Sequence, residues 1–136
     1  MAYATVQNLI DRYGQDQMLV LADRDNDGEL DSAVMDRALA DADAEVDAFL
    51  ARRYQLPLAE VPDVLQRIAC DIAVYRLCDN DAMVTDERRR RYEDAMSMLR
   101  RIGSGEVSLG ITPQAAQRKA AAAFYEGRPR RFRRDR

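Results

Sequence analysis

The sequence of 136 residues contains no histidine, no tryptophan and only two cysteines. The commonest general base and the commonest zinc ligand of proteins are therefore missing, which excludes most hydrolytic triads and zinc hydrolases. Gly-rich phosphate loops, nucleophile elbows and cysteine clusters are lacking as well. We find no candidate catalytic residue, and we expect a protein that is not an enzyme and needs no cofactor.

Long apolar runs are also lacking, since no stretch of about 18 uncharged apolar residues occurs. We expect no membrane span, no signal peptide and a cytosolic location. Cys70 and Cys78 are eight positions apart in one expected helix, about 12 Å along its axis, which is too far for a disulfide. We therefore expect two packed thiols. The length and the hydrophobic share of 47% fit one domain with one modest core.

Charge is present in quantity, but the two signs are segregated along the chain. Residues 1–50 carry twelve acids and three bases (−9), and residues 51–117 carry ten of each. Residues 118–136 carry eight bases and two acids (+6), which brings the net charge to −3. An acidic head and a basic tail are suited to docking between copies of one protein, or of the tail onto an acidic partner.

Apolar residues recur at three- and four-residue spacing, which predicts helices. Caps and breakers place these helices at residues 5–13, 15–21, 32–54, 62–78 and 85–103. Thr5 caps the first of them, Thr85 opens the last one and Gly103 ends it. The predicted fold class is all-α, a compact bundle of about four helices. A short extended segment near 104–111 and a protruding C-terminal helix and arm complete it. We place a helical domain at residues 1–111 and the C-terminal helix with its basic arm at residues 112–136.

The segment 23–31 matches ligand positions one, three, five and nine of a calcium loop, with the turn glycine at position six. The residues at those ligand positions are Asp23, Asp25, Asp27 and Asp31. The twelfth position, where a Glu normally supplies two oxygens, is Val34. We interpret the segment as an acidic, turn-forming loop in which Asp31 caps the next helix. A calcium-binding helical module is the alternative.

Two arginine-rich segments are candidate interaction sites. Arg88, Arg89, Arg90 and Arg91 occupy the first turns of an expected helix, where bases oppose the helix dipole unless acids of a partner offset them. We therefore expect a subunit interface there. The tail interleaves bases with one aromatic residue, as nucleic-acid contacts and interface anchors both do. Its candidate partner-binding residues are Arg128, Arg130, Arg131, Phe132, Arg133 and Arg134. A nucleic-acid-binding protein that uses this tail is a further alternative, and so is a merely solubilising tail.

The most informative segment ends the long acidic helix. It reads Arg53-Tyr54-Gln55-Leu56-Pro57-Leu58 and is followed by Val61-Pro62. Pro57 disfavours α geometry at Leu56, so the segment must form a fixed corner between two helices. We assign an architectural role to Arg53, Tyr54, Leu56, Pro57 and Leu58.

The order of several segments resembles that of the Mu-like phage head-completion proteins. The segments are Tyr3-Ala4-Thr5, Asp41 to Asp47, the corner Arg53 to Leu58, Val61-Pro62 and Ile68 to Ala73. The resemblance covers residues 3 to about 111. It implies a helical connector domain in a head-to-tail adaptor, with no catalytic residues.

Proteins of that kind form a ring, commonly of twelve subunits, beneath the portal. The resemblance therefore implies that this chain joins the DNA-filled head to a stopper or tail-completion protein. The tail would face the portal protein, with non-specific contact to packaged DNA as a secondary role. We expect the protein in the virion neck, and in the host cytoplasm during assembly.

Overall fold

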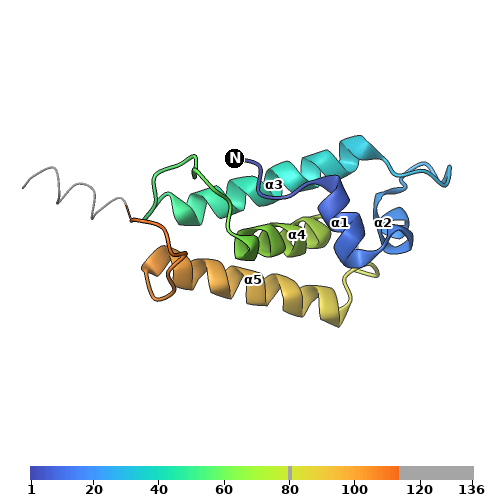
Figure 1. The fold of residues 1–136 in the computed structure, drawn as a ribbon. Helices are drawn as coiled ribbons and strands as arrows, with labels where there is room; N and C mark the ends of the chain where they lie inside the picture. The colour runs from blue at the N-terminus through green and yellow to red at the C-terminus, as the bar shows by residue number, and fades with distance from the viewer. Residues whose placement is uncertain (80, 114–136) are drawn as a thin grey trace, which may run out of the picture.

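The computed structural model describes residues 1–79 and 81–113, which form five α-helices and no strand (Figure 1). The helices are α1 (Val6–Tyr13), α2 (Gln15–Ala22), α3 (Ser32–Leu50), α4 (Asp63–Leu77) and α5 (Asp86–Ser104). In Figure 1, α3, α4 and α5 lie side by side with alternating chain direction, and α1 and α2 cover one end of this bundle. The all-α prediction is confirmed, and the five helices of the described residues correspond to the five predicted ranges. None of these helices is long and apolar enough to cross a bilayer.

The helix α4 forms the centre of the core because it packs against both α3 and α5. Eight of its fifteen residues are buried, and they lie on more than one of its faces. One of them is Cys70, and burial raises the pKa of its thiol to about 11. Cys70 and Cys78 are both free thiols, as predicted.

The N-terminal segment is bound along α3 by carboxylates of that helix. The Met1 ammonium group lies 3.1 Å from Asp47, and the Tyr3 hydroxyl donates to the same carboxylate at 2.5 Å. The backbone N–H of Tyr3 donates to Asp43 at 3.0 Å. Burial, followed by the bond to Asp47, raises the pKa of Tyr3. This network directs the chain to Thr5, whose side chain caps α1 in a capping box with Asn8.

Two helix ends differ from the prediction for reasons that the structure shows, whereas the other bounds differ by at most one residue. The helix α3 ends at Leu50 and not at residue 54, because the chain tightens into a turn in which the N–H groups of Arg53 and Tyr54 both donate to the Leu50 carbonyl. The helix α5 continues through Gly103 to Ser104, and Gly105, with φ of 89°, ends it instead. A glycine in this left-handed conformation is a common helix stop.

Gly103 therefore has a packing role. A Cβ atom at this position would lie 2.9 Å from the backbone carbonyl oxygen of Phe49 in α3. Its absence lets α3 and α5 approach closely. After α5 the chain turns back, with the Val107 N–H donating to the Arg101 carbonyl at 3.1 Å. Residues 105–113 contain turns and irregular chain. Of the C-terminal helix and arm predicted for residues 112–136, all but the first two residues lie outside the described part of the chain.

We predict that Gly103→Val lowers the free energy of unfolding by about 1–3 kcal/mol, because backbone atoms of α3 must move to admit the side chain. Denaturant unfolding followed by circular dichroism measures this change. Ser97→Val is the matched control, since it places the same β-branched side chain at an exposed position of α5. Equal destabilisation by the two substitutions would contradict the close approach of the helices.

Candidate functional site

The corner between α3 and α4 is fixed by two of its five predicted residues. Tyr54 is only 1% exposed, and its hydroxyl accepts a hydrogen bond from the Leu109 N–H at 3.3 Å. Leu58 is 8% exposed, and its N–H lies 3.1 Å from the Met1 sulfur. The corner therefore connects three parts of the chain that are distant in sequence: the N-terminus, the α3–α4 connection and the segment after α5.

The other corner residues lie nearer the surface. The Arg53 guanidinium lies against Gly105, at a place where a Cβ atom would collide with it. Leu56 is half-buried and Pro57 is exposed. The exposed side of the corner, together with Ile111 and Thr112, lines a groove of about 450 Å³. The structure therefore places the corner residues partly in the core and partly on an accessible surface.

The four arginines of the run Arg88–Arg91 differ in their surroundings. Arg88 donates to the Met83 carbonyl at 2.5 Å, and Arg91 pairs with Glu87 one turn earlier. Arg89 and Arg90 are exposed, with no ion pair among the residues described. The run therefore presents two unengaged guanidinium groups to solvent, and it directs Arg91 toward α1.

A group of polar residues that no sequence pattern brought together lies where α1, α4 and α5 meet. The Tyr13 hydroxyl donates to Asp71 of α4, and the Arg91 guanidinium lies 5.2 Å from the centroid of the Tyr13 ring. Burial, followed by the bond to Asp71, raises the pKa of Tyr13. Two adjoining hollows of about 240 and 220 Å³ share Tyr13 and Arg91, and we call them together the Tyr13 hollow. Its charged lining residues are Arg12, Arg67, Asp71, Glu87, Arg88 and Arg91.

The sequence gives only a weak signal for this hollow. Arg67 and Asp71 are one turn apart on α4, which places them on one face. Arg12, however, is far away along the chain, and its position depends on the angle at which α1 crosses the end of the bundle. Helical spacing within one segment could not reveal this arrangement.

The acidic loop 23–31 connects α2 and α3, and several of its carboxylates accept hydrogen bonds from backbone N–H groups. Asp23 accepts from the N–H groups of Asp27 and Gly28, at 3.2 and 2.9 Å. Asp27 accepts from Glu29 at 2.8 Å, and Asp31 caps α3 as predicted. Within residues 1–79 and 81–113 no group of three or more His, Cys, Asp or Glu side chains is arranged to hold a metal ion.

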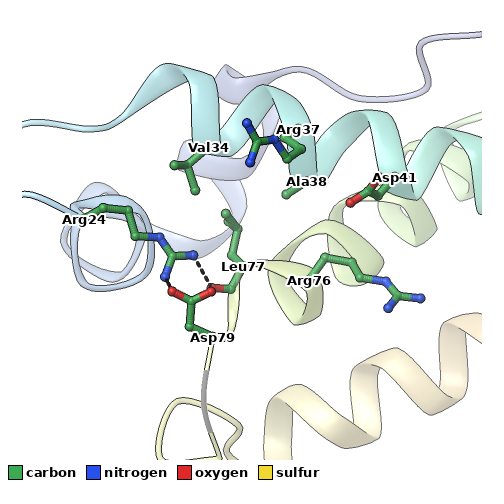
Figure 2. A pocket seen from close by; sticks show the side chains of 8 residues that line it. All are labelled: Arg24, Val34, Arg37, Ala38, Asp41, Arg76, Leu77 and Asp79. Carbon is green, nitrogen blue, oxygen red and sulfur yellow. Dashed lines mark hydrogen bonds and ion pairs between the residues drawn. The ribbon is translucent and has the colours of Figure 1, made fainter.

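The loop is attached to the bundle through its one base. Figure 2 shows Arg24 reaching from the end of α2 to the Asp79 carboxylate and to the carbonyl of Leu77, which accepts at 3.2 Å. The carbonyl groups at the end of α4 lack helical partners, so the guanidinium group satisfies one of them. A hollow of about 360 Å³ beside this contact is lined also by Arg37, Asp41 and Arg76.

These features lie in a chain whose residues 3–126 match the protein family described as Bacteriophage Mu, Gp36. The chain belongs to this family of Mu-like phage proteins. Among the Gp36 relatives, the Mu-like prophage FluMu protein gp36 of Haemophilus influenzae is 41% identical over 110 residues, which cover 81% of this chain and 77% of that protein. Gene product J of Escherichia phage Mu is 36% identical over 117 residues, which cover 85% of this chain and 82% of that protein.

The Gp36 match includes the corner, the Tyr13 hollow and the acidic loop. The predicted partner-binding residues of the tail lie outside the described residues and stay a prediction. They are Arg128, Arg130, Arg131, Phe132, Arg133 and Arg134. The structure brings the corner residues together in one place and the Arg88–Arg91 run in another, at opposite ends of the bundle (Figure 1).

We predict that Tyr54→Phe lowers the free energy of unfolding by about 1 kcal/mol, because the Leu109 N–H loses its acceptor. Hydrogen exchange should show faster exchange of the Leu109 amide. Tyr75→Phe is the matched control, since the Tyr75 ring stacks on Tyr92 with centroids 4.1 Å apart and no hydrogen bond of its hydroxyl is present in the described part of the chain. Unchanged exchange at Leu109 in the Tyr54 variant would show that the contact does not fix the corner.

We predict that millimolar calcium shifts the melting temperature of the protein by less than about 1 °C, since a ligand that does not bind cannot stabilise the fold. The oxygens of Asp23 and Asp27 already accept backbone bonds, and Val34 supplies no ligand. Thermal unfolding with calcium and with a chelator measures the shift. A rise with calcium that Asp25→Ala abolishes would establish the alternative calcium module.

Proposed function

We propose that this Gp36-family chain is the head-to-tail adaptor of a Mu-like phage. In this role it forms a ring of twelve subunits beneath the portal and joins the DNA-filled head to a stopper or tail-completion protein. Its function is mechanical, and it places the chain in the virion neck.

The observation that carries the proposal is the corner. The resemblance to head-completion proteins rests on the Arg53 to Leu58 segment and on the order of segments around it. In the fold this segment is where the N-terminus, the end of α3 and the segment after α5 are bound to one another. Contacts that join three distant segments at one point are suited to a subunit that must keep a fixed shape between two assemblies.

The distribution of contact surfaces supports the same role, because an adaptor must contact partners on more than one side. The corner and its groove lie at one end of the bundle, and the Arg88–Arg91 run lies at the other (Figure 1). We propose the run as a subunit interface that meets acidic residues of a neighbouring copy. Unlike surfaces that meet in this way can repeat around a closed ring.

The remaining contacts follow from the sequence. We propose that the arginine-rich tail, residues 126–136, binds the portal protein, because arginine and phenylalanine are typical of interface anchors. Packaged DNA that passes through the ring would make non-specific contacts with the same tail.

Deletion of the gene from a prophage should produce DNA-filled or emptied heads and separate tails, with a loss of infectious particles by several orders of magnitude. Electron microscopy of induced lysates and plaque titres measure both effects, and expression of the intact chain in trans is the control. Intact infectious particles from the deletion prophage would refute the adaptor role.

The interface is tested in the same system. A chain in which Arg88 to Arg91 are all replaced by Glu should fail to restore the titre. A restored titre would remove these four residues from the subunit interface and leave the adaptor role standing.

A further inference from the structure

The Tyr13 hollow has an excess of positive charge that the described residues 1–79 and 81–113 do not neutralise. Four guanidinium groups line it, from Arg12, Arg67, Arg88 and Arg91, against the two carboxylates of Asp71 and Glu87. Arg12 and Arg67 are exposed, and no carboxylate of the described chain lies within 4 Å of their nitrogens. Asp71 is occupied by the Tyr13 hydroxyl and Glu87 by Arg91. The hollow therefore presents two arginines that have no carboxylate partner among the described residues, around a partly buried ring. One of them, Arg12, lies beside the neutral thiol of Cys70.

The acidic loop 23–31 has the opposite excess. It carries five acids and one base, and that base, Arg24, is held by Asp79. The side chains of Asp25 and Glu29 are exposed and make no hydrogen bond or ion pair within the described residues. In Figure 1 the loop projects beyond the ends of α2 and α3. Two free carboxylates are thus presented at the tip of a protrusion.

We propose that the Tyr13 hollow binds the acidic loop 23–31 of a second copy of this chain. Arg12 and Arg67 pair with Asp25 and Glu29 of the neighbour, as planar guanidinium groups do with carboxylates. The inference rests on the proposed ring, and it names the surfaces through which adjacent subunits meet.

Charge favours a second copy over nucleic acid as the occupant. The hollow contains two carboxylates of its own, and residues 1–50 carry a net charge of −9. A duplex would bring many phosphates against these acids at once, whereas a single loop brings only its tip. Because both charges are on the same chain, each subunit also has one positively charged and one negatively charged contact surface.

Two charge reversals test the contact. Arg12→Glu with Arg67→Glu reverses the hollow, and Asp25→Arg with Glu29→Arg reverses the loop. Sedimentation equilibrium of the purified protein at low ionic strength should show self-association of the unmodified chain, and each reversal should weaken it at least about tenfold. An equimolar mixture of the two variants should associate again, because each then meets the complementary surface of the other. A chain that carries all four substitutions should also regain self-association.

The matched control is Arg52→Glu with Arg100→Glu, which makes the same change of charge at two exposed positions away from the hollow. This variant should associate like the unmodified chain, and circular dichroism should show all variants folded. The inference is overturned if the unmodified chain is a monomer at every concentration, if the reversals leave association unchanged, or if the mixture stays dissociated. In the last case, loss of duplex DNA retention in the hollow variant alone would identify nucleic acid as the occupant.

The two proposals fail separately. Association of the free protein does not depend on heads or tails, so it tests the contact between the hollow and the loop. Whether the deletion prophage still joins heads to tails tests the adaptor role. If the purified chain associates through the hollow and the loop but the deletion prophage still joins heads to tails, the contact stands and the adaptor role fails. If the deletion blocks joining but the charge reversals leave association unchanged, the adaptor role stands and the subunit interface lies elsewhere.

Discussion

The burial of α4 between α3 and α5 is the constraint on which the rest of the structure depends. A helix with eight buried residues of fifteen cannot be stable with one face in water, so it requires a neighbour on either side. Those neighbours must approach closely, which Gly103 permits against the backbone of Phe49. Packing of the three antiparallel helices fixes the positions of the two ends of the bundle. It therefore also fixes the corner at one end and the Tyr13 hollow at the other.

The polar contacts at each end of the bundle connect segments that the core does not hold. At one end Tyr54 binds the chain after α5, and at the other Arg24 binds the end of α4. Tyr3 and Asp47 bind the N-terminus along α3. Each contact lies at the margin of the core, where a hydrogen bond between neutral groups contributes about 0.5–1.5 kcal/mol and one to a charged group about 1.5–3 kcal/mol. These contacts fix the loops, which are the parts of the chain available to partners.

The sequence predicts the helices well because local patterns decide them. Thr5, Asp31 and Thr85 are caps in the structure as in the prediction, and the buried stripes of α3 and α4 follow the apolar spacing. The errors fall where tertiary contacts override local signals. Glycine is a common residue at helix ends, but Gly103 packs against α3 within the helix. Gly105 ends the helix instead, because it adopts a positive φ. The Tyr13 hollow was missed for a related reason, since its residues come from three helices.

Segregated charge and a rigid fold have related consequences for an assembly protein. In a flexible chain, the acidic N-terminal half and the arginines of α5 could neutralise each other within one molecule. Here the bundle holds the loop 23–31 and the Tyr13 hollow as separate surfaces, and Asp71 and Glu87 engage only part of the positive charge. Among the residues that the structure describes, these arginines and carboxylates have no partner of opposite charge, which leaves them accessible to other molecules. A rigid subunit with unsatisfied charge of both signs is suited to associate with copies of itself, and the salt dependence of that association would follow from the exposure of these groups.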